Sequence, residues 1–178
     1  MSKVFFLSLL LSLILAGNAD AAETKIGVFN SRAIAANCAP LKDAQKKLES
    51  QFANERNALE KQSQELKRQA DQIQTQQAGM NPDAREDALV KFQRQKRDFE
   101  DRYQAFARKA ENAAARLEEE FVNNLMTAAQ DYGNRKGYNI LLDSAIGGPV
   151  FYTKDADVTN DMITEVTRVY KEKPAGSR

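Results

Sequence analysis

The chain has 178 residues, about the length of one domain, and its charges nearly cancel, with 26 Lys and Arg against 25 Asp and Glu. This balance excludes a strong global field toward nucleic acid or an anionic membrane. The absence of histidine and the single cysteine exclude histidine-based catalysis, a zinc site and a disulfide framework. With neither a nucleophile elbow nor a glycine-rich phosphate loop, the sequence predicts neither an enzyme nor a cofactor.

Residues 1–21 are typical of a cleaved secretory signal. Lys3 precedes an apolar run from Val4 to Ala16, and Ala19-Asp20-Ala21 has the small-x-small pattern of a cleavage site near Ala21. A membrane anchor is the competing interpretation, but crossing a bilayer takes about 20 apolar residues and this run is shorter. At the other end, residues 173–178 are predicted to be a flexible tail.

Residues 25–30 alternate in the manner of a strand, with Ile26 and Val28 on one face. Asn30 or Ser31 is suited to cap a short helix that runs to Asn37. Cys38 is predicted to be a small buried apolar residue, an intermolecular disulfide being the less favoured alternative.

Residues 41–136 predict two long helices that form an antiparallel hairpin. Apolar residues recur in steps of three, four or seven, which places them on one narrow face of each helix. Gly79 is expected to end the first helix in the left-handed conformation, and Asn81 and Pro82 to begin the second, so the tip lies near 79–82. The seam residues are Leu41, Ala44, Leu48, Phe52, Leu59, Leu66 and Ile73 in the first helix and Phe92, Phe99, Tyr103, Phe106, Ala110, Ala113, Leu117, Phe121, Leu125, Ala128 and Tyr132 in the second.

The hairpin also predicts its own register. A turn centred between Met80 and Asn81 places Leu59 opposite Tyr103 and Phe52 opposite Ala110, near Phe106. The helices would span roughly 58 Å and roughly 80 Å at 1.5 Å per residue. Four-residue steps from Ala113 to Leu125 form a stutter that locally unwinds the supercoil. So thin a hairpin buries little and needs a base or partners.

After Gly137, which is expected to end the second helix, residues 138–143 and 150–153 predict two strands joined as a β-hairpin. Both faces of the first of these strands are expected to be covered. Asp157, or Val158 with Thr159, then caps a last helix to about Tyr170. The apolar face of that helix consists of Met162, Ile163, Val166, Val169 and Tyr170.

Residues 22–40 and 137–172 are therefore predicted to form a discontinuous β/α body at the base of the hairpin. Its short strands would leave open edges and apolar surface, which favours closure between several copies. The fold class is mainly α with a small β body, assembled by oligomerisation. The predicted assembly core consists of Ile26, Val28, Ile140, Leu142, Val150 and Tyr152.

In order and spacing, these pieces resemble the Skp (OmpH) family of periplasmic chaperones. The resemblance rests on the strand at 25–30, the long hairpin, Tyr138-Asn-Ile-Leu-Leu-Asp143 and Asp157-Val-Thr159. It implies a periplasmic homotrimer with a small β-barrel core and three tentacles around a cavity. That cavity would hold unfolded outer-membrane β-barrel proteins without ATP. The resemblance also suggests a membrane lipid or lipopolysaccharide partner, assigned to no named position, and no nucleic acid.

The hairpin departs from the basic character of that family, with 18 Lys and Arg against 17 Asp and Glu in 41–136. Its cations gather in the half toward the tip, and a cationic tip would aid client capture. An ordinary solvated helix face is the alternative. The aromatic residues Phe92, Phe99, Tyr103 and Phe106 are predicted to pack in the seam rather than line a cavity. The candidate client-binding residues are Lys61, Lys67, Arg68, Met80, Lys91, Arg94, Lys96 and Arg97.

A structural coiled-coil spacer or adaptor of the cell envelope is the alternative function. It explains the long helices equally well but does not explain the strand segments and the terminal helix.

Overall fold

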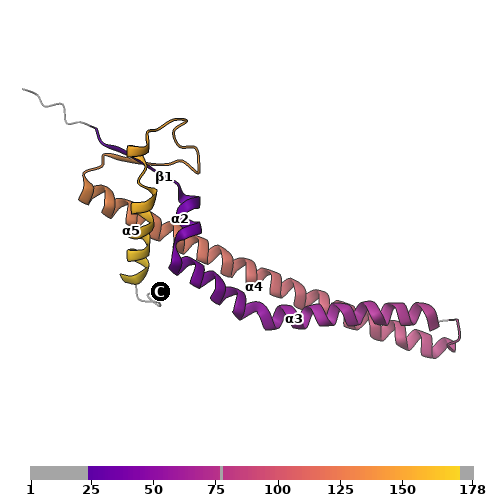
Figure 1. The fold of residues 1–178 in the computed structure, drawn as a ribbon. Coiled ribbons are helices and arrows are strands. Elements are labelled where there is room, and N and C mark those ends of the chain that lie inside the picture. Colours follow the sequence, from indigo (N-terminus) through magenta and orange to yellow (C-terminus); the bar gives the residue numbers. More distant parts are fainter. Residues whose placement is uncertain (1–23, 77, 173–178) are drawn as a thin grey trace, which may run out of the picture.

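The computed structural model describes residues 24–76 and 78–172, which form a small body and a long two-helix projection (Figure 1). The predicted signal at 1–21 and the predicted tail at 173–178 lie outside the described residues. No described helix combines the length and apolar character needed to cross a bilayer. The elements are β1 (Ile26–Phe29), α2 (Ser31–Asn37), α3 (Ala39–Gln76), α4 (Pro82–Lys136), β2 (Ile140–Asp143), the 3₁₀ helix η1 (Lys154–Ala156) and α5 (Thr159–Glu172).

Capping residues set the helix ends largely as the sequence indicates. The Asn30 side chain accepts from the Ala33 amide at 2.9 Å, and the Asn81 side chain accepts from the Ala84 amide at 2.8 Å. Gly137 ends α4 in the left-handed region, at a φ of 69°. The prediction for Gly79 was wrong, because α3 already ends at Gln76 and Gly79 has no positive φ. Its amide instead donates to the Gln76 carbonyl in a tight turn.

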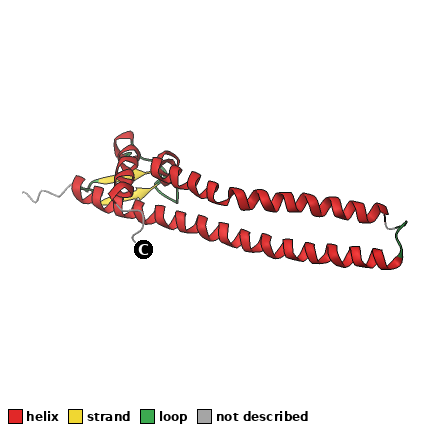
Figure 2. Ribbon diagram, turned by 90° about the horizontal axis from the view of Figure 1, so that it is seen from below, coloured by secondary structure: helices red, strands yellow, loops and turns green. Residues whose placement is uncertain are grey.

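The antiparallel hairpin of α3 and α4 is confirmed, close to the predicted register (Figure 2). The rings of Phe52 and Phe106 meet edge to face, with centroids 5.7 Å apart, and Lys109 Nζ lies over the Phe52 ring. Arg102 donates to the Gln62 side chain at 2.7 Å, whereas the predicted register places Gln62 opposite Phe99, three positions earlier. Leu59 and Leu66 are buried in the seam. The apolar stripe therefore pairs the two helices, in a register that the short turn sets.

The sheet differs from the prediction. β1 and β2 pair in parallel, with Ile26 opposite Ile140 and Val28 opposite Leu142. The predicted strand at 150–153 and its β-hairpin were wrong, since this segment is an irregular connection in the chain. The expectation that both faces of residues 138–143 are covered was also wrong within one chain, because Ile140 and Leu142 remain exposed.

The core of the body lies where α5 crosses α4 beside the start of α3 (Figure 1). Residues from α2, α3, α4 and α5 meet there, and Cys38 is a fully buried free thiol, as predicted. The apolar face predicted for the last helix is confirmed. This core contains Phe29, Ile34, Cys38, Leu41, Phe121, Leu125, Ala128, Tyr132, Val158, Met162, Val166 and Val169. Because α4 belongs to both the core and the hairpin, the body fixes the direction in which the hairpin leaves it.

Candidate functional site

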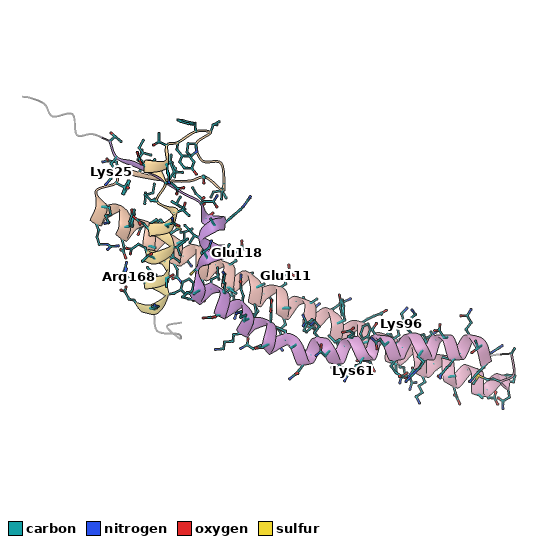
Figure 3. The ribbon with its side chains drawn as sticks, in the orientation of Figure 1. Lys25, Lys61, Lys96, Glu111, Glu118 and Arg168 are labelled. Carbon is teal, nitrogen blue, oxygen red and sulfur yellow. The ribbon has the colours of Figure 1, made fainter. Side chains whose placement is uncertain are left out.

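A network of ion pairs connects α5 to the last turns of α4. Arg168, which is labelled in Figure 3, bonds Glu165 at 2.9 Å and Asp131 at 2.9 Å. Arg135 bonds Glu165 at 2.5 Å. The hydrogen bond from Arg135, reinforced by Arg168, holds the pKa of Glu165 below its usual value. A hollow of about 330 Å³ is lined by Asp131, Asn134, Arg135 and Arg168. Both of its guanidinium groups are already paired with carboxylates, so the network serves to hold the two helices together.

Two tyrosines complete this junction. The Tyr132 hydroxyl donates to Asp161 at 2.5 Å, and its ring stacks on Tyr138 with centroids 5.6 Å apart. Burial, followed by the Asp161 hydrogen bond, raises the pKa of Tyr132 above its ordinary range. Burial also raises the pKa of Tyr170 to about 12. The Tyr132 and Tyr170 hydroxyls are therefore neutral at physiological pH.

The body exposes a set of large apolar side chains, which we call the body's apolar set. It belongs to the two strands and to the segment between β2 and η1, and Val150 and Phe151 stand out, 106% and 82% exposed. Ile26 and Ile140 are paired across the strands, so they share a face of the sheet, and both are exposed. The opposite face packs inward, where a Cβ on Gly27 would lie 2.7 Å from the Leu141 side chain. The set consists of Ile26, Ile140, Leu142, Ile146, Val150, Phe151 and Tyr152.

Five of the six residues of the predicted assembly core thus lie on the surface of the chain, and one does not. Val28 is 2% exposed, and its carbonyl accepts from the Val158 amide. Val28 pairs with Leu142 on one edge of β1 and bridges to Asp157 on the other edge, so it lies between two segments of the chain. Sequence reasoning missed Ile146 and Phe151. Ile146 falls in a predicted turn, where an apolar residue beside two glycines and a proline was the available signal.

The seven candidate cations of the hairpin are all exposed, and Met80 is half-buried at the tip. Figure 3 places Lys61 and Lys96 along the middle of the hairpin, with Glu111 and Glu118 nearer the body. Arg68 pairs with Glu65 and Lys96 with Glu100, whereas no salt bridge among the described residues involves the other five. Pairs this exposed contribute little and exchange readily.

These cations form a belt rather than a cationic tip. We define the cationic belt as 57–70 and 91–103, which contain eight Lys and Arg against five Asp and Glu. Residues 71–90, around the turn, contain four acidic residues and one Arg. The excess of cations therefore lies in the belt, whereas the start of α4 is acidic, with Asp83, Glu86 and Asp87. The role of the cations in client capture stays a prediction.

One aromatic residue departs from the predicted seam. Phe92, Phe99 and Phe106 are half-buried between the helices, as expected, but Tyr103 is 54% exposed. Its ring stacks on Phe99, with centroids 6.0 Å apart and planes inclined by 30°. Leu59, the residue expected to cover Tyr103, is itself buried. The belt therefore carries a fixed aromatic ring on its surface.

Among residues 24–76 and 78–172, no group of three or more Cys, Asp or Glu side chains is placed to hold a metal ion. What the described chain offers is extended surface, namely a solvated belt on the hairpin and an exposed apolar set on the body.

The comparisons with known proteins agree with this architecture. The model of the family "Outer membrane protein (OmpH-like)" matches residues 25–166, which is most of the chain. A crystal structure of a "putative outer membrane chaperone (OmpH-like)" from Caulobacter crescentus CB15 superposes with a TM-score of 0.65 at 15% identity. That match covers 83% of this chain and 86% of the other, so it establishes a shared fold. No curated protein matches the chain.

Proposed function

Because this chain belongs to the OmpH-like outer membrane protein family, we propose that it is an ATP-independent periplasmic holdase. In this proposal it binds unfolded outer-membrane β-barrel proteins between its hairpins and prevents their aggregation. The predicted signal at 1–21 directs the chain to the periplasm, where no ATP is available. The observation that carries the proposal is the hairpin itself, a projection anchored at one end and solvated along its length.

The hairpin suits a client that has no fixed shape. An unfolded chain offers no surface for a shaped pocket to fit, so affinity must come from many weak contacts. The exposed belt supplies cations on long apolar stems, which contact polar and apolar client segments alike. Candidate contacts remain Lys61, Lys67, Arg68, Met80, Lys91, Arg94, Lys96 and Arg97.

A homotrimer accounts for the exposed surface of the body. Seven large apolar side chains in so small a body favour association. Within the described residues, β2 has no partner along its second edge, and 150–153 has strand-like sequence without a strand. In the proposed trimer these surfaces close a small β-barrel, with Ile26, Ile140, Leu142, Val150 and Tyr152 inside it and three hairpins around a cavity. Phe151 is buried between neighbouring copies. A lipid or lipopolysaccharide surface remains a secondary partner without assigned residues.

Two measurements test the proposal together. Native mass spectrometry of residues 22–178 should show a trimer, and a trimer carrying one client after addition of a urea-unfolded β-barrel protein. In parallel, light scattering should show that the chain suppresses aggregation of that client in the absence of ATP. A monomer would contradict the assembly, and a trimer that leaves aggregation unchanged would contradict the holdase function.

The alternative function is a structural spacer of the envelope, which the long helices also suit. A spacer needs the hairpin for its length only, so it should not suppress client aggregation. The scattering experiment therefore separates the two functions without further variants.

A further inference from the structure

One flank of α4 carries an exposed line of three side chains. Leu89, Lys96 and Tyr103 follow one another at intervals of seven residues, or two helical turns, and so lie along the same side of the helix. Each interval spans about 10.5 Å, which separates Leu89 from Tyr103 by about 21 Å. We call these three residues the α4 flank line.

Both ends of this line are apolar and open to solvent. Leu89 is 41% exposed and Tyr103 is 54% exposed. Stacking on Phe99 restricts the Tyr103 ring, so an incoming side chain meets an ordered aromatic surface at low entropic cost. Between them Lys96 pairs with Glu100 at 3.7 Å, an exposed ion pair in which another carboxylate can displace Glu100.

We propose that the α4 flank line binds an extended client segment in which apolar side chains alternate with polar ones. This inference rests on the proposed holdase function and names the segment that the hairpin prefers. Along a strand, six residues advance by about 20 Å, and residues i and i+6 project from the same face. An apolar residue at each of these positions therefore matches Leu89 and Tyr103.

The charge of the line and its surroundings adds a second preference. The ammonium group of Lys96 lies between the two apolar contacts, and the belt around it has three more cations than acidic residues. A client carboxylate at i+2 or i+4, which projects from the same face as i and i+6, would replace Glu100 as the partner of Lys96. Transmembrane β-strands are segments of about ten residues with strict alternation, so an unfolded β-barrel protein offers many pairs of apolar residues at i and i+6.

Two fluorescent peptides of about 11 residues test this geometry by anisotropy. They share one composition, with Phe at i and i+6 and one Glu at i+2, on the same face, in the first, and Phe at i and i+5, on opposite faces, in the second. The chain should bind the first peptide several-fold more tightly. Tyr103→Ser and Leu89→Ser should each weaken that binding roughly three- to tenfold and remove the preference.

Two further variants serve as controls for the peptide-binding experiment. Val90→Ser removes a neighbouring side chain that is 40% exposed but lies about a quarter turn from the line, so it should leave both affinities unchanged. Tyr103→Phe keeps the ring and should retain the preference. Equal binding of the two peptides by the unmodified chain, or an equal loss in Val90→Ser, would overturn the proposal.

The outcome is separable from that of the proposed function. If the unmodified chain suppresses aggregation of a whole client but Tyr103→Ser does so equally well and keeps the peptide preference, the holdase function stands and the flank line is wrong. If Tyr103→Ser instead changes the subunit number in native mass spectra, the line is a contact between copies, which also overturns the proposal.

Discussion

Replacing the two most exposed apolar residues of the body should dissolve the proposed trimer without unfolding the chain. The double variant is Val150→Ser with Phe151→Ser. Both side chains project from the segment after β2 and belong to no buried cluster within the chain. The secondary structure of the variant, measured by circular dichroism, should therefore be unchanged, while its assembly weakens.

The size of this effect follows from exposure. Fully burying a Val or Phe side chain contributes about 1.5–3 kcal/mol, and the lower value allows for incomplete burial at an interface. Two residues in each of three copies then contribute about 9 kcal/mol to the trimer. This is a factor of about 10⁶ in the association constant, at about 1.4 kcal/mol per factor of ten. Because three chains combine, the concentration of half-assembly rises as the square root, by about 10³-fold.

Sedimentation velocity across a series of protein concentrations measures the concentration of half-assembly directly. Leu89→Ser with Val90→Ser is the matched control, because it also removes two exposed apolar side chains, but near the hairpin tip. The control should assemble as the unmodified chain does. A Val150/Phe151 variant that assembles at the same concentration as the control would refute the role of the body's apolar set.

Three further predictions concern the hairpin and its base. Leu59→Ala, in the buried seam, should lower the free energy of local hairpin opening, measured by hydrogen exchange, by about 2–3 kcal/mol. Faster exchange only in the helical turn that contains residue 59 would contradict this prediction. Gly137→Ala should lower the free energy of unfolding, measured by urea titration, by about 1 kcal/mol, because an L side chain is strained at the positive φ of this position. Gly79→Ala is the control and should leave that free energy unchanged. Equal effects of the two variants would refute the role of Gly137 as the cap of α4. Because folding lowers the pKa of Glu165, its contribution to stability is complete above the ordinary value of 4.5 and is lost as the pH falls through the folded value. Glu165→Gln should therefore flatten the acid limb of a plot of melting temperature against pH, and an unchanged acid limb would assign it to other carboxylates.

Local patterns account for most of what the sequence predicts correctly. The hairpin follows from apolar spacing of three and four, and its register follows from the short turn, since a slip along the seam would separate Phe52 from Phe106. Asn81 and Gly137 mark the ends of α4 because capping is a short-range interaction. These features need no information from distant parts of the chain.

Pairings between segments that are distant in the sequence were harder to predict from the sequence. β1 and β2 are separated by more than a hundred residues, and the sequence indicates that both are strands but not that they run parallel. Residues 150–153 have strong β-propensity, yet propensity reflects packing against neighbouring strands, and the chain alone supplies none at this segment. The error there has the same physical origin as the exposed apolar set, because both describe a surface that lacks its partner.

Tyr103 shows why apolar spacing alone cannot separate a core residue from a binding residue. It follows Phe99 by four and precedes Phe106 by three, which is the spacing of the seam. In the structure neither Arg102 nor Tyr103 enters the seam at this level, because Leu59 is already buried there and Arg102 reaches across the outside to Gln62. The ring is therefore displaced outward while Phe99 still orders it. An aromatic side chain with the spacing of a core residue and the exposure of a surface residue is what a hairpin needs in order to hold its own shape and a client at once.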